Sequence, residues 1–166
     1  AADDHALTTL VLKALKILSR KFSNRLRIGA LVMHDLVQLL GASDADDAHS
    51  AEAANVALNV CYERKNVLLL TQAGGIPPLV SLLRADNLDV QANAAGALQS
   101  ICYQKEGRGV VRENGALQAL VPLLSSPSIK VQTRATGAMH NLSSDADAIR
   151  IIRRLRGVPP LVSLLN

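Results

Sequence analysis

The sequence predicts an all-α solenoid, because three independent landmarks recur with a period of about 41 residues. Self-similarity at a period of roughly 20 to 50 residues is the signature of proteins in which small units stack in a row. The landmarks are an L-V-x-L-L string that begins at Leu36, Leu79, Leu120 and Leu161, a Cys-Tyr pair at 61–62 and 102–103, and glycines at 74, 115 and 157.

Each period contains three predicted helices. The first carries the L-V-x-L-L string, whose apolar residues at i, i+3 and i+4 lie on one face of a helix. Prolines at 77–78 and 159–160 follow glycines, and a glycine can end one helix where a proline opens the next. A longer, alanine-rich helix covers about 90–103, and a stretch such as 110–113 or 148–155 is long enough for a further helix.

The ends and the first unit deviate from this pattern. Residues 7–20 align with the long helix, so the chain begins inside one unit and ends inside another. We therefore expect a fragment of a longer array, or ends that pair with another chain. The string GASDADDAH at 41–49 is two residues longer than its equivalents and is predicted to be an exposed acidic loop. The predicted units are a partial repeat 1–29, repeats 30–73, 74–114 and 115–157, and a partial repeat 158–166.

The composition narrows the class of protein. Hydrophobic residues make up 49% of the chain and aromatic residues 2%, so the core must consist of Leu, Val, Ile and Ala. A net charge of +4 is too modest for a dominant nucleic-acid-binding face, so no nucleic-acid partner is expected. No apolar run reaches the roughly 18 residues of a membrane span, so no transmembrane segment is expected. An intracellular, cytoplasmic protein is the default, and Cys61 and Cys102 fit a reducing compartment as packing residues.

The pattern resembles the armadillo-repeat family. The motif consists of a glycine, then P-L-V-x-L-L, then V-Q at 90–91 and 131–132, then A-A-x-A-L, and it covers nearly the whole chain. The resemblance implies units of three helices that stack into a right-handed superhelix. The HEAT family has units of similar length but two helices in each, and the short first helix and the V-Q landmark argue against it.

The resemblance also implies a partner-binding site. In the armadillo family the third helices line a concave groove, where a recurrent asparagine bonds the main chain of an extended peptide. The aligned positions are Asn59, Ser100 and Asn141, and a carboxamide can satisfy both a C=O and an N–H of a peptide. The alternative is that these amides satisfy backbone carbonyls of the neighbouring repeat. The residues expected to form the groove walls include Asn55, Glu52, Asn93, Arg134, Tyr62 and Tyr103.

One branch of the family is disfavoured, and the acidic ligand class of a second branch stays open. Importin-α proteins carry tryptophans one turn before the asparagines, but here those positions are Asn55, Gly96 and Gly137, and the sequence has no tryptophan. The β-catenin branch has a strongly basic groove, whereas this one mixes Glu52 with Arg134. The sequence therefore predicts a non-catalytic module that binds an extended segment of a protein partner, without identifying that partner.

Two other functions remain open. The chain could be a structural segment of a cytoskeletal or ciliary scaffold that uses its ends and convex face, with end-to-end self-association of the repeats. It could also bind an anionic surface through the basic helix 150–156, where Arg150, Arg153 and Arg154 share a face. No enzyme, cofactor or metal site is expected, because the four histidines are scattered and show no ligand spacing.

Overall fold

The computed structural model describes residues 2–42 and 47–165 of the chain. This part consists of helices joined by short turns and contains no strand. The eleven helices in the described residues are α1 (Ala2–Ser19), α2 (Phe22–Gly41), α3 (Asp47–Val60), α4 (Arg64–Gln72), α5 (Ile76–Leu82), α6 (Leu88–Tyr103), α7 (Lys105–Glu113), α8 (Ala116–Leu123), α9 (Ile129–Leu142), α10 (Ala146–Arg154) and α11 (Val158–Ser163).

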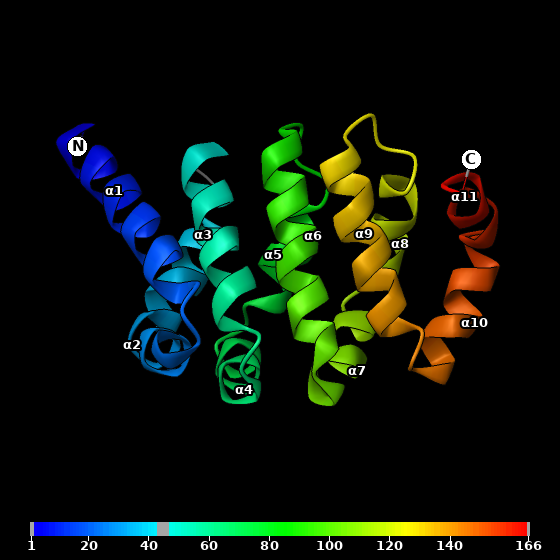
Figure 1. Cartoon of the computed structure of the whole chain (residues 1–166), viewed down its shortest axis with the longest axis horizontal. Coiled ribbons are helices and arrows are strands. Elements are labelled where there is room, and N and C mark those ends of the chain that lie inside the picture. Colours follow the sequence, from blue (N-terminus) through cyan, green and yellow to red (C-terminus); the bar gives the residue numbers. More distant parts are fainter. Residues whose placement is uncertain (1, 43–46, 166) are drawn as a thin grey trace.

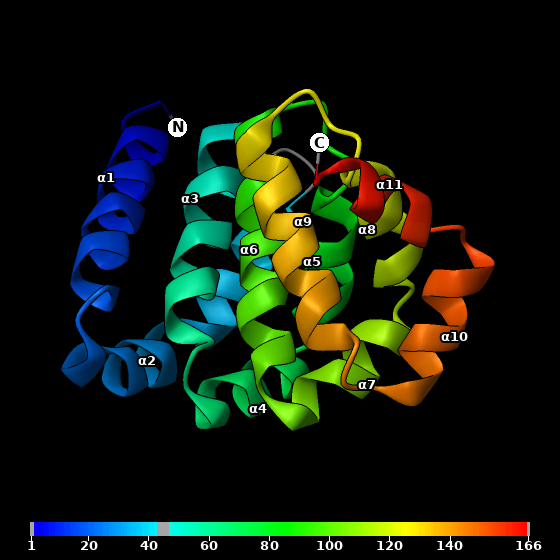
Figure 2. The ribbon, with the colours of Figure 1, turned by 45° about the vertical axis from the view of Figure 1, so that its right-hand side comes forward.

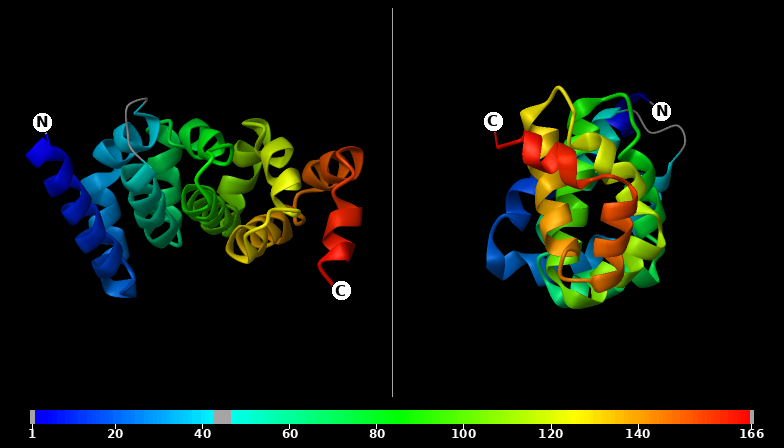
Figure 3. Two further views of the ribbon diagram at one scale, coloured as in Figure 1. Left: turned by 90° about the horizontal axis from the view of Figure 1, so that it is seen from above. Right: turned by 90° about the vertical axis from the view of Figure 1, so that its right-hand side faces the viewer.

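The helices form the open solenoid that the repeat predicts. Four long helices, α1, α3, α6 and α9, stand side by side in one row, and each packs against the next (Figure 1). Helices α5 and α8 lie behind this row, while α4, α7 and α10 lie along one edge of it (Figures 1 and 2). Seen from above, the row curves between α1 at one end and α11 at the other (Figure 3, left). The all-α right-handed solenoid fold is thus confirmed.

A residue with positive φ separates the short helices of each later pair, α4/α5, α7/α8 and α10/α11, and prolines open α5 and α11. Gly74 and Gly115 have φ angles of 76° and 75°, in the left-handed region that glycine adopts without a steric penalty. Pro77 and Pro78 then occupy the first turn of α5, where a missing N–H costs nothing. In the last unit the left-handed residue is Arg156, with φ 55°, one position before the glycine of the sequence pattern.

The start of the chain departs from the predicted helix pattern. The helix that carries the first L-V-x-L-L string and the short helix before it are fused into the 20-residue helix α2. Leu31 and His34 stand where the next unit has Gly74 and Pro77, so nothing interrupts the backbone hydrogen bonds. The expected boundary at 29/30 therefore falls inside α2, while the predicted repeat 30–73 still contains three helical segments: the second part of α2, then α3 and α4. The acidic loop predicted at 41–49 lies partly in 43–46, outside the described residues, while Gly41 ends α2 and Asp47 begins α3.

Small aliphatic residues fill the core, as the composition predicts. One continuous cluster of buried residues runs from α1 to α10, and alanines at the centres of α3 and α6 are fully enclosed. Alanine brings neighbouring long helices close together, because its side chain ends at Cβ. None of the described helices has the length and apolar character needed to cross a membrane.

We expect the two cysteines to be unreactive in the folded protein. Cys61 and Cys102 are free and buried, and burial raises the pKa of the Cys61 thiol to about 12 because it disfavours the thiolate. Ellman's reagent should label neither thiol in native buffer and both in denaturant, since the thiolate is the reactive form. Rapid labelling of native protein would contradict this packing.

Candidate partner-binding face

The row of α1, α3, α6 and α9 forms one surface, called here the third-helix face. The residues predicted to form the groove lie on or just after α3, α6 and α9. Their side chains do not stand free. At each junction between neighbouring long helices, two positions of the repeat send side chains toward the preceding helix, and most of these make polar contacts with it.

The first of these positions is the predicted asparagine ladder. The Asn59 amide nitrogen donates to the backbone oxygen of Lys16 at 3.0 Å and to the Ser19 hydroxyl at 3.1 Å. The Asn141 amide nitrogen donates to the backbone oxygen of Gln99 at 2.8 Å. Both asparagines therefore bond the neighbouring repeat, which is the alternative that the sequence left open. Among the described residues, neither Oδ1 atom has a hydrogen-bond donor.

The middle position of the ladder is closed. Ser100 is only 1% exposed, and its hydroxyl oxygen has no hydrogen-bond partner in the described part of the chain. A peptide lying on this surface has no access to that oxygen. The expectation that Ser100 contacts a partner therefore conflicts with its burial between α6 and its neighbours.

The second bridging position lies two helical turns earlier, at Glu52, Asn93 and Arg134. The Glu52 carboxylate pairs with the Lys16 ammonium of α1 at 2.6 Å. Asn93, which is 7% exposed, donates to the backbone oxygen of Ala51 at 2.9 Å. Arg134 donates from Nη1 to the Gln99 side chain at 3.3 Å. One repeat position thus carries a negative, a neutral and a positive side chain in successive junctions.

The position between these two differs among the junctions. Asn55 donates to the Asn93 side-chain oxygen at 3.4 Å. Its equivalents are glycines, which leave room for side chains of the adjacent helix. The Arg134 side chain lies over Gly96, and the Gln99 side chain lies over Gly137. Because these side chains fill the space beside the two glycines, the third-helix face is less open around α6 than expected for a groove lined by free asparagines.

The two tyrosines sit at the C-terminal ends of α3 and α6. Tyr62 is 37% exposed, and the Arg25 guanidinium lies over its ring at 4.9 Å from the centroid. Tyr103 is 63% exposed. Tyr103 therefore offers an open aromatic surface, whereas one face of Tyr62 is already covered.

The basic residues of α10 do not belong to the third-helix face. This helix lies at the edge of the row with α4 and α7 (Figure 1). Arg150 pairs with Asp147 at 2.6 Å, while Arg153 and Arg154 are exposed. The charge available to an anionic surface is therefore smaller than three arginines suggest.

The sequence reasoning missed a set of capping side chains that repeats along the chain. Arg25, Asn66 and Arg108 each donate to the carbonyl oxygen six residues earlier, at the C-terminal end of a long helix. Asn66 is 1% exposed and also donates to the backbone oxygen of Arg25 at 2.9 Å. Donors at this end satisfy carbonyls that the helix leaves unpaired. These three residues are 41 and 42 positions apart, close to the repeat period, and this spacing could have identified them in the sequence.

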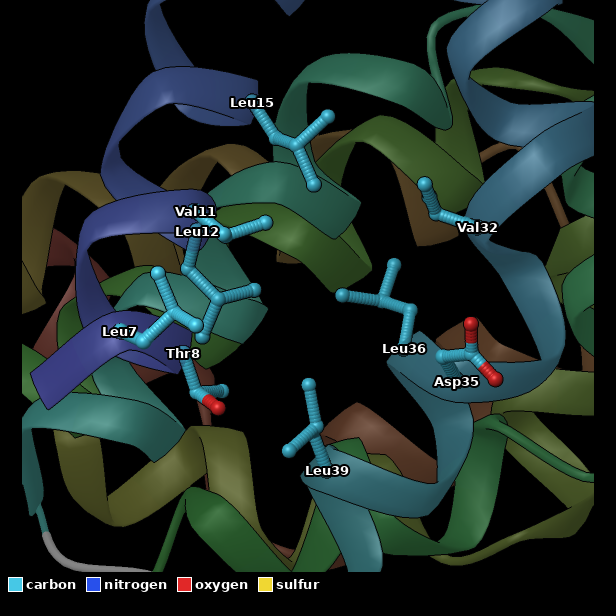
Figure 4. A pocket seen from close by; sticks show the side chains of 9 residues that line it. All are labelled: Leu7, Thr8, Val11, Leu12, Leu15, Val32, Asp35, Leu36 and Leu39. Carbon is cyan, nitrogen blue, oxygen red and sulfur yellow. The ribbon is translucent and has the colours of Figure 1, made fainter. Parts of the chain in front are cut away.

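A pocket that the sequence did not predict opens between α1 and α2. It has a volume of about 270 Å³, and side chains of both helices point into it (Figure 4). Its walls are aliphatic except for Thr8 and Asp35. The L-V-x-L-L helix α5 packs against both the long helix α6 that follows it and α2, which carries the preceding L-V-x-L-L string. The pocket occupies the corresponding position beside α1.

Comparison with known proteins also indicates an armadillo-repeat solenoid. A family model described as "Armadillo/beta-catenin-like repeat" matches residues 64–103 and 104–144. An engineered protein of known crystal structure is similar over 95% of the chain, with 30% identity and a TM-score of 0.89. A designed armadillo repeat protein is similar over 95%, with 28% identity and a TM-score of 0.87.

A second designed armadillo repeat protein, solved in complex with the peptide (KR)4, is similar over 93% of the chain, with 29% identity and a TM-score of 0.84. The chain spans 65%, 68% and 66% of the lengths of these three proteins, in that order. No curated protein matches the sequence significantly. The family matches start at the short helices α4 and α7, one helix before the predicted units, which start at glycines.

Proposed function

Because the chain belongs to the armadillo-repeat family, we propose that it binds an extended segment of a partner protein along the third-helix face. Armadillo solenoids are typical of non-catalytic binding proteins. One designed relative was solved with a bound peptide, and another was designed for modular peptide recognition. These relatives support a protein-interaction module, and the contacts of this chain suggest how a segment would be held.

The observation that carries the proposal is the hydrogen-bonding capacity left on two asparagines. Asn141 uses one amide hydrogen on Gln99, so it keeps a second donor and an acceptor. Asn59 uses its amide nitrogen on two oxygens, so it keeps an acceptor. A peptide main chain offers both an N–H and a C=O to such groups. The bonds to the neighbouring repeat fix each amide, which lowers the entropic cost of binding.

Because Ser100 is buried, the proposed contacts with the peptide main chain come from Asn59 and Asn141, which are two repeats apart. Stacked helices lie roughly 8 to 10 Å apart, so two repeats separate Asn59 and Asn141 by roughly 16 to 20 Å. An extended chain advances about 3.3 Å per residue, and the two main-chain contacts should lie about five or six ligand residues apart. The ligand is thus held at alternate repeats.

Replacing both asparagines by alanine tests the proposal. The probe is the tightest peptide that the wild-type protein selects from a phage-displayed library of random dodecapeptides. Each hydrogen bond contributes about 1 kcal/mol, so the double variant Asn59→Ala, Asn141→Ala should bind this peptide at least about tenfold more weakly by fluorescence anisotropy.

Asn66→Ala is the matched control. It removes a carboxamide that bonds two backbone oxygens away from the third-helix face, so it should lower stability without changing the dissociation constant. Unchanged affinity in the double variant, or an equal loss in Asn66→Ala, would refute the proposed contacts. A library that yields no binder would refute peptide binding itself.

One observation favours the scaffold alternative. The side of α1 that faces away from α3 exposes a row of aliphatic residues, namely Leu7, Leu10, Val11, Ile17 and Leu18. Such a row can bury against another helical unit. A scaffold function would be unaffected by the two asparagine substitutions, so the same experiment separates the two candidates. A cytoskeletal or ciliary location stays a prediction.

A further inference from the structure

Arg134 is a cation on the third-helix face that has no counter-ion among the described residues. The Lys16 ammonium pairs with Glu52 across the α1/α3 junction at 2.6 Å, and the Lys130 ammonium pairs with Asp89 across the α6/α9 junction at 2.6 Å. Arg134 lies one turn after Lys130 on α9. No carboxylate of the described residues lies within 4 Å of its guanidinium, and its hydrogen bond to Gln99 is 3.3 Å long.

The Arg134 side chain lies close to a glycine of α6. A Cβ at Gly96 would overlap the Leu58 side chain and would also lie 3.3 Å from Arg134 Cδ and 3.4 Å from Nε, so glycine leaves room for both side chains. Arg134 is half-buried there. A guanidinium has five N–H donors in a planar fork that matches a carboxylate, and Arg134 uses one of them within the protein.

We propose that Arg134 selects an acidic side chain in the bound segment, an inference that rests on the proposed function. Glu52, Asn93 and Arg134 occupy the same position in successive repeats. The Glu52 charge is neutralised by Lys16, Asn93 has no charge, and the Arg134 charge has no carboxylate partner among the described residues. A ligand along the face therefore meets an uncompensated positive group at the α6/α9 junction. Burial of an unpaired charge is costly, and a carboxylate from the ligand removes that cost.

The reach of the two side chains is compatible with a peptide held at Asn141. Seven residues separate Asn141 from Arg134, which is about 10 Å along the helix. The extended side chains of Arg134 and of a glutamate on the ligand can together bridge the distance between the Arg134 backbone and a peptide main chain held at Asn141. The designed relative that was solved with (KR)4 binds a peptide of the opposite charge, so a basic peptide is a useful probe of the difference.

Three synthetic peptides of equal length test the inference: (ES)4, its neutral isostere (QS)4 and the basic (KS)4. The wild-type protein should bind (ES)4 about tenfold more tightly than (QS)4, because a half-buried guanidinium gains a charge-assisted hydrogen bond. Arg134→Gln should bind (ES)4 and (QS)4 equally, and Arg134→Glu should prefer (KS)4. The preference should shrink as the salt concentration rises.

Lys130→Gln is the control for overall charge. It removes one positive charge from the same helix, one turn away, but from an ammonium that Asp89 already neutralises. It should keep the preference for (ES)4. Equal binding of (ES)4 and (QS)4 to the wild-type protein, or an equal loss in Lys130→Gln, would overturn the role of Arg134 and leave the peptide-binding face intact. If none of the three peptides binds while the library-selected peptide does, the role of Arg134 is overturned and the proposed face stands; failure of all four peptides would overturn both.

Discussion

Leu98→Ala should lower the free energy of unfolding by about 3 to 4 kcal/mol, as expected when a large aliphatic side chain leaves a cavity in a packed core. Leu98 is 0% exposed at the centre of α6, which packs against α3, α5, α7 and α9. In a solenoid the stability is roughly a sum of unit and nearest-neighbour terms. A cavity in α6 weakens two junctions between long helices at once. Urea denaturation followed by far-UV circular dichroism measures the effect.

Leu12→Ala in α1 is the matched comparison. Leu12 is also buried, at 3% exposure. Its helix α1, however, makes extensive contacts with only two of the described helices, α2 and α3. The same deletion should cost about 2 kcal/mol there, at the lower end of the range for buried leucines. Equal losses at the two positions would mean that the array unfolds as one unit and does not distribute its stability over junctions.

Gly107→Ala should lower the free energy of unfolding by about 2 to 3 kcal/mol, because the added Cβ overlaps a backbone oxygen and no side-chain rotation can relieve the overlap. Gly107 lies buried in the first turn of α7, against the carbonyl oxygen of Ile101 at the end of α6. The Cβ would also lie 2.6 Å from Ile101 Cγ2. The two helices would have to move apart. Thermal unfolding monitored by circular dichroism measures the loss.

Gly109→Ala is the control within the same helix. A Cβ at Gly109 would have Arg112 Nη2, 3.9 Å away, as its nearest neighbour, so the substitution meets open space. It should stabilise the protein by about 0.5 to 1 kcal/mol through the helix propensity of alanine. A similar loss in both variants would show that the flexibility of α7, and not its close approach to Ile101, requires glycine.

The repeat pattern predicted the fold well because it depends on local signals. The L-V-x-L-L strings and the glycines mark helix faces and helix ends, and both follow from the chemistry of neighbouring residues. The pattern failed at the boundary expected at 29/30, where α2 is continuous. That difference was also readable in principle, because Leu31 and His34 replace the glycine and the proline that separate the helices elsewhere.

The candidate site was predicted only in outline. Alignment put Asn59, Ser100 and Asn141 at one position of the repeat, but equivalent positions do not have equal exposure. Ser100 is buried, while the two asparagines bond the neighbouring helix and retain acceptors. These differences depend on what the adjacent helix contributes. The Gln99 side chain over Gly137 and the Arg134 side chain over Gly96 are contacts between repeats, and a single repeat does not contain them.

The sequence by itself determined the period of the repeat and most of its helix faces and helix ends, because hydrophobic periodicity and turn residues act within about ten residues of one another. The tertiary structure alone decided which polar groups keep free hydrogen-bonding capacity on the third-helix face. Neighbouring repeats supply the oxygens that take the amide hydrogens of Asn59 and Asn141, and the carboxylates that neutralise Lys16 and Lys130 but leave Arg134 unpaired. Hydrogen bonds and ion pairs form over a few ångströms in space, whatever the separation along the chain.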